Sequence, residues 1–529
     1  MTGRATRRLA LATVLAAAAG APLGAQASPY VPLDDPAYSY VDALQARGLL
    51  GRLSLTERPY TAAALLTAVD ATVAAGARGG VTNGWLAALR TRAARHVPRV
   101  AEASPADGVA LVGAIGVRLT GQTTARRELA LADDDAAMHP GGELRVGAAT
   151  GPVVLGARYA LDQRWTDDPD FEGFDEGGVA GRVEEGYLAG QWRYGELFFG
   201  RLSRRWGPGT LPGLQIGDAA PSYDHLHGRL GTRALHLATI VARLDDTPGL
   251  FAPRVQRFLA VHRLAGAWRG FEAALTESYV YSGADRGLEP SLVNPLAPVL
   301  LTHYNEDQAG NVSFGAEAAW RTRAGVFGVQ GMLDDYQFED GAEETDEPPS
   351  YGLTLSAEGL PLWGEQRWFA SYTRVSNLAY RTPEPGDNHV RRGVGLGRAF
   401  DDYDEARLGL DLAVLPWAPA RLTVLRRRQG EGDYRAPFPA VADYDVTPAF
   451  LVGEVATVTR LAVETGGAVG GLAWRLDAGW NRVRGAGRPI RAAQGATPLA
   501  ASGLAGRVTL SWEPGLLRLV MRDEAPAPR

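Results

Sequence analysis

A short stretch of the chain, GRLSRRWGPG at residues 200–209, brings cationic and aromatic side chains together after a strand-like run. A guanidinium binds a carboxylate through two parallel hydrogen bonds, and an indole offers a flat apolar surface. The proline of the following turn restricts φ and its glycines permit a tight bend. The pattern predicts recognition of an anionic ligand, or neutralisation of nearby carboxylates. The residues concerned are Arg201, Arg204, Arg205 and Trp206.

Further polar and aromatic candidates follow along the chain. In SYDHLHG, Tyr223 precedes a His-x-His pair that begins at His225, and this spacing puts two imidazoles on one strand face. No third ligand is evident in the sequence, so we expect no metal site and no cofactor. Tyr281 and Asn294 belong to a loop region whose aromatic and amide groups suit recognition of sugar hydroxyls. A loop that folds back as a plug is the alternative.

Asp334 and Asp335 end an alternating run, FGVQGMLDD. Paired carboxylates carry out glycoside hydrolysis in many enzymes, but neighbouring acidic residues are common on any polar strand face. The sequence contains no G-x-S-x-G elbow, no H-E-x-x-H helix and no P-loop. We therefore expect a binding protein rather than an enzyme, with these two aspartates as candidate contacts to a sugar.

Composition narrows the class of protein. The chain has 529 residues and a net charge of -6, and all 54 basic residues are arginine. This slightly acidic balance gives no electrostatic reason to expect nucleic acid as a partner. Cysteine is absent, which excludes disulfides and thiolate metal sites.

The N-terminus has the anatomy of a secretory signal peptide. MTGRATRR is basic, LALATVLAAAAG is apolar, and Ala25-Gln26-Ala27 is a small-x-small cleavage site. We expect residues 1–27 to be removed on export. No later stretch reaches the roughly 18 apolar residues that a membrane-spanning helix requires.

Residues 28–104 have a helical pattern. SYVDALQARGLLG, TAAALLTAVDATVAAGARGG and NGWLAALRTRAARHVP repeat apolar residues at spacings of three and four, and each ends at glycine or proline. Thr61 stands at the start of the second segment, where its hydroxyl is suited to cap a helix. Three short alanine-rich helices this close together predict a small bundle.

From about residue 105 to the C-terminus the period changes to two. In VVLGARYALDQRW, Leu155, Tyr159 and Leu161 fall on one face, and Arg158 and Asp162 fall on the other. The segments reach about ten residues, and tight turns alternate with long polar loops such as TDDPDFEGFDEGG. This predicts an all-β fold, a large closed antiparallel transmembrane β-barrel of about 16–18 strands. A soluble exported sandwich is the alternative, because its strands alternate too.

Alternation within ELFFGRL also predicts which side chains face the lipid. We expect Phe198, Gly200 and Leu202 on the outside, and Arg201 and Arg205 in the lumen. An arginine that faces lipid at the midplane costs about 2–4 kcal/mol. The last segment, GRVTLSWEPGLLRLVMR, predicts a terminal hairpin with its turn at EPG.

Several stretches together resemble one family. DPAYSYVDALQARGLLG with RPYTAAALL is similar to the helical opening of Wzi-type capsule-assembly proteins. GRLSRRWGPGTLPGLQIGDAAPSYDHLHG is similar to their basic strand end, WGPG turn and small-residue segment, although residues 218–221 read DAAP rather than DNAP. LAVHRLAGAWRGFEAALTESYVYSG with LVNPLAP, then FGVQGMLDDYQF, then VRRGVGLGRAFDDYDEARLGLDL follow in matching order. The resemblance spans nearly the whole chain after the signal peptide.

The resemblance implies a monomeric outer-membrane barrel of a Gram-negative-type bacterium, with a periplasmic helical bundle at 28–104 and the barrel at 105–529. It also implies a lectin-like role, in which the protein binds capsular or surface polysaccharide and helps to retain or assemble it, surrounded by lipid and lipopolysaccharide. The alternative is an outer-membrane channel for sugars or other small solutes. The candidate glycan contacts are Arg201, Arg204, Arg205, Trp206, Tyr223, His225, Tyr281, Asn294, Asp334 and Asp335.

Overall fold

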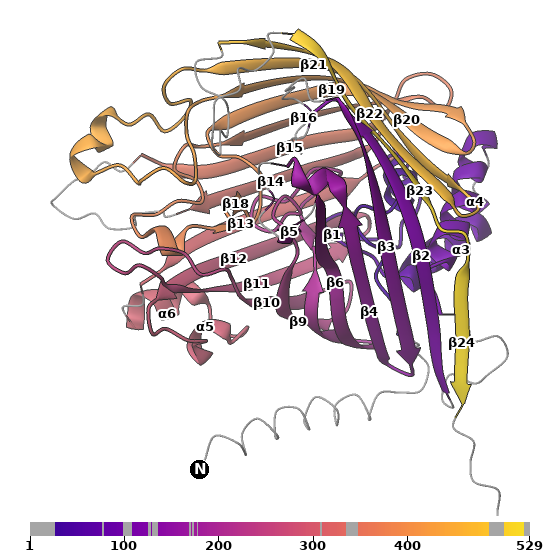
Figure 1. The fold of residues 1–529 in the computed structure, drawn as a ribbon, viewed down its shortest axis with the longest axis horizontal. Helices are drawn as coiled ribbons and strands as arrows, with labels where there is room; N and C mark the ends of the chain where they lie inside the picture. Colours follow the sequence, from indigo (N-terminus) through magenta and orange to yellow (C-terminus); the bar gives the residue numbers. More distant parts are fainter. Residues whose placement is uncertain are drawn as a thin grey trace, which may run out of the picture.

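The computed structural model describes residues 27–76, 79–98, 108–124, 129, 136–168, 171, 174–176, 178–306, 309–334, 348–485 and 502–522. Residues 1–26, and with them nearly all of the expected signal peptide, lie outside it. Most of the described chain forms one closed antiparallel β-barrel, which follows three N-terminal helices (Figure 1).

The strands run up and down around the barrel, and consecutive strands pair with each other. The segments of the wall are β2 Gly108–Gln122, β3 Ala137–Thr150, β4 Val153–Asp162, β5 Phe174–Glu176, β6 Val179–Trp192, β7 Gly195–Leu202, β9 Tyr223–Gly231, β10 His236–Arg243, β11 Gln256–Trp268, β12 Phe271–Gly283, β13 Asn311–Arg321, β14 Val326–Asp334, β15 Ser350–Pro361, β16 Arg367–Val375, β19 Tyr403–Leu415, β20 Ala418–Gln429, β21 Ala456–Val469, β22 Leu472–Arg484, β23 Ser502–Trp512 and β24 Leu516–Arg522.

These segments make a closed barrel of 18 strands, because the short β5 pairs with β6 alone and β24 continues β23. At one end, which we call the short-turn end, tight turns such as Arg193-Tyr194 between β6 and β7 connect the strands. At the other, the long-loop end, connections such as 376–402 between β16 and β19 are much longer. The predicted fold class is confirmed.

The two-residue period separates an apolar outer face from a polar inner face. On β4, Leu155, Tyr159 and Leu161 are 43%, 48% and 56% exposed on the outside. Arg158 and Asp162 alternate with them and are buried in the lumen. The predicted faces of this strand are confirmed.

The barrel closes between its first and last strands. β23 pairs with the second half of β2, where Trp512 is opposite Val117, and β24 pairs with the first half, where Leu516 is opposite Ala114. Both segments run in the same direction along β2, so residues 513–515 interrupt one long strand. The predicted terminal hairpin is therefore wrong. Proline lacks an N–H and breaks the ladder locally, but β2 offers partners on both sides of the break.

Three helices precede the barrel, as predicted: α2 Ala37–Gln45, α3 Ala62–Ala74 and α4 Gly80–Ala94. The Thr61 hydroxyl caps α3 by accepting a hydrogen bond from Ala64 N at 3.2 Å. No helix in the described ranges has the length and apolar character needed to cross a membrane. The helices share a core that includes Tyr40, Val41, Leu44, Leu65, Trp85 and Leu89.

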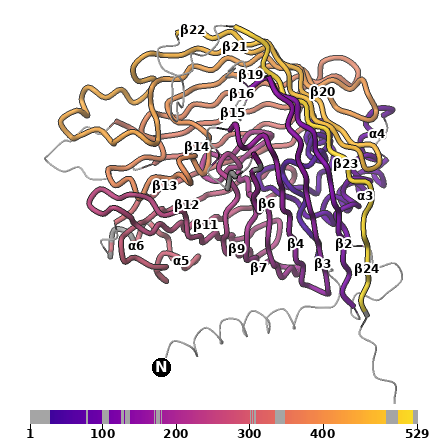
Figure 2. Tube along the Cα trace, viewed as in Figure 1, coloured from indigo at the N-terminus to yellow at the C-terminus, as the bar shows by residue number. Residues whose placement is uncertain are grey.

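This helical bundle packs against the short-turn end of the barrel, where it contacts β19, β20 and β21 (Figure 2). The Tyr40 hydroxyl donates to Trp417 O at 2.8 Å, and Trp85 Nε1 donates to Leu415 O at 2.9 Å. Both carbonyls belong to the turn region between β19 and β20. The bundle is thus tied to the barrel by partly buried hydrogen bonds to backbone carbonyls at the turn between β19 and β20.

Candidate functional site in the barrel lumen

Two long loops fold into the lumen and meet there. The first, 207–222, connects β8 Arg205–Trp206 to β9, and the second, 376–402, connects β16 to β19. Most residues of both loops are buried. We call the two loops together the lumen plug. The second loop contains a short hairpin of its own, β17 Val390–Arg391 and β18 Val394–Gly395.

The two loops of the plug contact each other through their backbones. Gly217 N donates to Leu396 O at 2.7 Å, and His389 Nε2 donates to Gln215 O at 2.8 Å. A Cβ at position 217 would lie 2.1 Å from Gly397 O, so only glycine permits this approach. The crossing point therefore combines close backbone packing with side chains of the second loop that bind backbone carbonyls of the first.

The barrel wall holds the plug from several sides. The Arg257 guanidinium on β11 is buried and donates hydrogen bonds to three plug carbonyls, those of Gly386, Asn388 and Val390. Apolar contacts add to this anchoring: Leu214 packs in one core cluster with Met332, Val375, Val458 and Val483 from four strands of the wall. The plug thus spans the lumen between different parts of the barrel.

The faces of β7 are opposite to those predicted, because its even-numbered residues point into the lumen. Phe198 is fully buried, whereas Phe199 is 66% exposed on the outer wall. Arg201 is therefore also on the outer wall, where it pairs with Asp224 at 2.6 Å. Consecutive apolar residues in ELFF leave alternation ambiguous, and the contact of the Phe198 ring with Tyr30 decides the register.

Arg204 lies inside an aromatic cluster. Its guanidinium carbon is 4.6 Å from the ring centre of Phe198 and 5.5 Å from that of Tyr30. Arg204 Nε donates to His225 Nε2 at 2.9 Å, and Nη2 lies 3.6 Å from Glu196 Oε1. Both Arg204 and His225 are buried, at 7% and 3% exposure. Their contacts hold the N-terminal segment at Tyr30 against the barrel wall.

Arg205, Trp206 and Tyr223 flank the plug. Arg205 binds Asp218 through two hydrogen bonds, at 2.5 Å from Nη2 and 3.1 Å from Nε. Trp206 is 4% exposed, and the guanidinium carbon of Arg263 lies 5.2 Å from its ring centre. Tyr223 is buried as well. The chemistry expected of this stretch, guanidinium to carboxylate and cation over indole, is present as contacts within the protein.

Tyr281 and Asn294 lie apart from the plug, at the long-loop end. The buried ring of Tyr281 stacks on Phe258 and Tyr279, in the same cluster as Leu292 of α5 Pro290–Val293. Asn294 ends α5 and is exposed. Tyr281 therefore positions a loop on which Asn294 faces the solvent.

Of the two acidic candidates, the structure describes only Asp334. Asp334 is 1% exposed and accepts a hydrogen bond from the backbone N–H of Tyr380 in the plug. Asp335 lies outside the described residues. The structure therefore brings Arg204, His225 and Tyr223 together, and it does not bring them together with Asn294.

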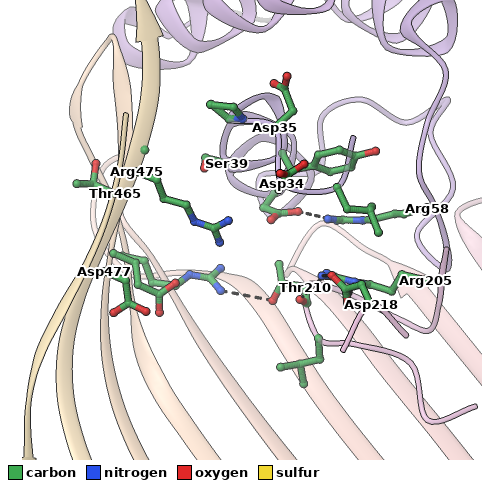
Figure 3. Close-up of a pocket in the computed structure, with 18 of the residues that line it drawn as sticks. Asp34, Asp35, Ser39, Arg58, Arg205, Thr210, Asp218, Thr465, Arg475 and Asp477 are labelled. Carbon is green, nitrogen blue, oxygen red and sulfur yellow. Dashed lines mark hydrogen bonds and ion pairs between the residues drawn. The ribbon is translucent and has the colours of Figure 1, made fainter. Parts of the chain in front are cut away.

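A cavity of about 550 Å³ lies between the helical bundle, the plug and the barrel wall. We call it the lumen chamber. Figure 3 shows side chains that approach it from three sides: Asp34 and Ser39 from α2 and the residues just before it, Thr210 and Asp218 from the plug, and Arg475 from β22.

The chamber is lined by charges of both signs in equal number. Arg421 pairs with Asp411 at 2.7 Å and Arg158 with Asp34 at 2.9 Å, so arginines from the wall neutralise carboxylates around the chamber. Arg475 is exposed within the chamber, and no ion pair joins it to another described residue. The lining charges are Arg47, Arg58, Arg118, Arg158, Arg164, Arg182, Arg205, Arg407, Arg421, Arg475 and Arg507, with Asp34, Asp35, Asp42, Asp168, Glu184, Glu185, Asp218, Glu358, Asp411, Glu464 and Asp477.

A second ionic cluster joins the helical bundle to the barrel seam. Glu513, between β23 and β24, accepts hydrogen bonds from Arg92, Arg95 and Arg145 at 2.9–3.3 Å. His96 Nε2 lies 2.9 Å from Asp35 Oδ2, and Arg145 Nη1 lies 3.1 Å from His96 Nδ1. We call these six residues the docking cluster. The cluster was not predicted from the sequence, although RTRAARH places Arg92, Arg95 and His96 on one helical face.

The docking cluster predicts that acid weakens the attachment of the helical bundle. Burial and the neighbouring Arg145 lower the pKa of His96 to about 4, from an ordinary value of 6.5. Burial disfavours the Asp35 carboxylate, yet Arg92 and His96 hold the pKa of Asp35 well below its ordinary value. Both groups therefore stabilise the docked state at neutral pH and lose that contribution as the pH falls.

The stabilisation that depends on neutral His96 is lost as the pH falls from 6.5 to about 4, and the full loss of stability is about 3 kcal/mol. We expect the helix signal at 222 nm to melt at a lower temperature at pH 4.5 than at pH 7. In His96→Gln the fall in melting temperature between pH 6.5 and 4.5 should disappear. An identical pH profile in the variant would contradict the assignment.

The described residues contain no group of three or more His, Asp or Glu side chains arranged to hold a metal ion. His225 and His227 do share the lumen face of β9, as the spacing predicted, but each is engaged by a neighbour. His225 contacts Arg204, and His227 Nδ1 lies 3.4 Å from Glu196 Oε1. The pair is part of the packing beside the plug.

No protein-family model and no curated protein matches this sequence. Among solved structures, the chain is similar to Wzi of Escherichia coli, an outer-membrane carbohydrate-binding β-barrel involved in group 1 capsule assembly. That match has a TM-score of 0.57 at 13% identity and covers 92% of this chain and 99% of Wzi. OprD and OpdK of Pseudomonas aeruginosa match at TM-scores of 0.41 and 0.42, both at 12% identity, over 78% of this chain and 95% and 99% of theirs. The likeness to Wzi establishes a shared fold over nearly the whole chain.

Proposed function

We propose that the protein is an outer-membrane barrel that binds capsular or other surface polysaccharide and helps to retain or assemble it, without a catalytic step. In this proposal residues 1–27 direct export, the helical domain at 28–104 lies in the periplasm, and the barrel at 105–529 spans the membrane as a monomer. Short turns on the periplasmic side and long loops outside are the usual arrangement in bacterial barrels.

The observation that carries the proposal is the lumen plug. A channel needs a continuous aqueous path, whereas here two loops meet within the lumen through hydrogen bonds to backbone carbonyls, and Arg257 anchors one of them. The helical bundle packs at the opposite end. A binding role agrees with this arrangement, and the similar fold of Wzi, a carbohydrate-binding barrel, supports it.

The polysaccharide would be contacted at the long-loop end. Phe251 in the loop between β10 and β11 is 93% exposed, and the nearby Arg254 pairs with Asp246 while remaining exposed. The neighbouring loop carries Asn294, and a hydrogen bond from Gln256 Nε2 to Ala284 O links the bases of the two loops. An aromatic ring, a guanidinium and an amide are the groups that suit an acidic sugar.

We expect Phe251→Ala/Arg254→Ala to weaken polysaccharide binding by about tenfold or more, equivalent to ~1.4 kcal/mol. The measurement is titration of the detergent-purified full chain with surface polysaccharide from the bacterium that encodes it. The matched control is Trp268→Ala/Arg269→Ala, which removes an exposed aromatic and an arginine in contact with it at the short-turn end. Equal loss in both variants, or no saturable binding by the unaltered protein, would overturn the proposal.

An outer-membrane channel for sugars or other small solutes is the second candidate, and the polar lumen chamber favours it. A pathway for hydrophilic solutes needs a polar lining, and the chamber is lined by charged side chains of both signs. Stable conductance of the unaltered protein in a planar bilayer would favour this function over polysaccharide binding. A silent bilayer together with saturable polysaccharide binding would favour the first.

A further inference from the structure

The outer face of β20, β21 and β22 changes from apolar to cationic near the long-loop end. Val424, Leu461 and Trp480 pair across these three strands and form one row on the outer wall. They are 48%, 60% and 52% exposed, so the row is apolar and faces outward. An aromatic residue at this height is typical of the aromatic girdle at the interface between the hydrocarbon core and the headgroups of the membrane.

The next two rows toward the long-loop end are cationic. By strand register, one row is Arg426, Thr459 and Arg482, and the following row is Arg428, Thr457 and Arg484. All four arginines are exposed. Each step of two residues along a strand keeps side chains on the same face, so the arginines share the outer wall with the apolar row below them.

The four arginines carry little compensating negative charge. Arg428 pairs with Asp404 at 2.5 Å, and Asp404 lies outward on the neighbouring β19. Arg426, Arg482 and Arg484 form no ion pair with any residue that the structure describes. Guanidiniums on a lipid-facing wall are costly unless they reach the interface or meet an anion. This patch therefore has an excess of positive charge at the height where lipid headgroups begin.

The spacing suits a phosphate group. Adjacent strands lie about 4.8 Å apart and successive rows about 7 Å apart, so the arginines stand at the corners of a patch of roughly 10 by 7 Å. The hydroxyls of Thr457 and Thr459 occupy its centre. Two guanidiniums can close on one phosphate through charge-assisted hydrogen bonds, with a threonine hydroxyl as a further donor.

We propose that this patch on β20–β22 binds the phosphate groups of an anionic lipid in the outer leaflet. The occupant is a lipid rather than a free anion because the apolar row directly below the arginines offers a surface for its acyl chains. The inference rests on the membrane location given in the proposed function, and it adds a specific lipid site on the outer wall that polysaccharide binding does not require.

The test uses the full chain in detergent and native mass spectrometry with three lipids: diphosphoryl lipid A, monophosphoryl lipid A and phosphatidylcholine. We expect diphosphoryl lipid A to bind most tightly. Arg426→Gln/Arg482→Gln should weaken its binding by roughly thirtyfold, since each arginine near an anionic surface contributes about 1 kcal/mol. The control, Arg193→Gln/Arg269→Gln, removes the same charge from exposed turns at the short-turn end and should leave the affinity within about twofold.

Equal affinity of the Arg426→Gln/Arg482→Gln variant and the unaltered protein would overturn the site. So would equal binding of phosphatidylcholine, or full displacement of the lipid by excess inorganic phosphate, which would mark a site for free anions. Failure of the proposed function has a different signature. If the chain does not insert into phosphatidylcholine vesicles, the membrane location fails. If the chain inserts but binds no polysaccharide, the proposed binding function fails while the lipid site is still supported by its own measurement.

Discussion

Trypsin is expected to cut the lumen plug of Gly397→Val, at arginines that it does not reach in the unaltered protein. A Cβ at position 397 would lie 1.8 Å from Leu214 O, and no rotamer change relieves a clash with a backbone oxygen. The two loops must separate at their crossing point, which costs about 1–3 kcal/mol and raises the opened population roughly 5- to 150-fold. Cleavage should follow Arg381, Arg391 and Arg398, which are buried in the unaltered plug.

The control for this experiment is Gly331→Val on β14. A Cβ at this position meets nothing within 4 Å, so the added side chain has room. Its digestion pattern should match that of the unaltered protein. Rapid cleavage of the plug in the control, or a resistant plug in Gly397→Val, would show that the crossing does not hold the loops in the lumen.

Glu513→Gln is expected to release the helical bundle from the barrel. The substitution keeps the shape of the side chain but removes the negative charge that faces Arg92, Arg95 and Arg145. Removing one partner from a buried ionic cluster costs about 3–5 kcal/mol, because the remaining charges stay desolvated. Since Asp35 still pairs with Arg92, we expect the lower end of this range. Amide hydrogen exchange in α4 should accelerate by about a hundredfold.

Asp70→Asn provides the matched control. Asp70 and Arg90 form an ion pair at 3.3 Å within the same bundle, but both side chains are more than half exposed. Exposed pairs contribute about 0–1 kcal/mol, so exchange in α4 should change little. Equal acceleration in both variants would mean that the docking cluster does not attach the bundle.

The variant that combines Glu513→Gln with Gly397→Val is expected to conduct ions across a planar bilayer better than either single variant. The reason is that both obstructions of the lumen, the plug and the helical bundle, are loosened.

How far the fold follows from sequence is seen by comparing β4 with β7. On β4 an apolar residue alternates with a polar one, and the predicted faces are correct, including buried Arg158 and exposed Tyr159. On β7 apolar residues stand side by side, and the predicted faces are inverted. The difference is physical: alternation defines two faces, but only a contrast in polarity says which one meets the lipid.

The candidate site shows the same limit. Arginine, tryptophan and a glycine-rich turn at residues 200–209 correctly indicated guanidinium chemistry, but the partners Asp218, His225 and Arg263 come from a loop and other strands. The docking cluster is similar, because the end of α4 and the two residues after it supply Arg92, Arg95 and His96, while Glu513 comes from the far end of the chain. No local pattern connects such positions.

The sequence by itself determined the local properties of this protein: the helical period before residue 105, the strand period after it, and the alternation of short turns with long loops. These follow from steric and solvation preferences that act over a few residues. Only the tertiary structure decided what fills the lumen, which face of β7 turns inward, and that the EPG segment interrupts a strand. Those outcomes depend on packing between residues more than 150 positions apart, as with Tyr30 against Phe198 or Gly217 against Gly397, where a contact exists only once the barrel has closed.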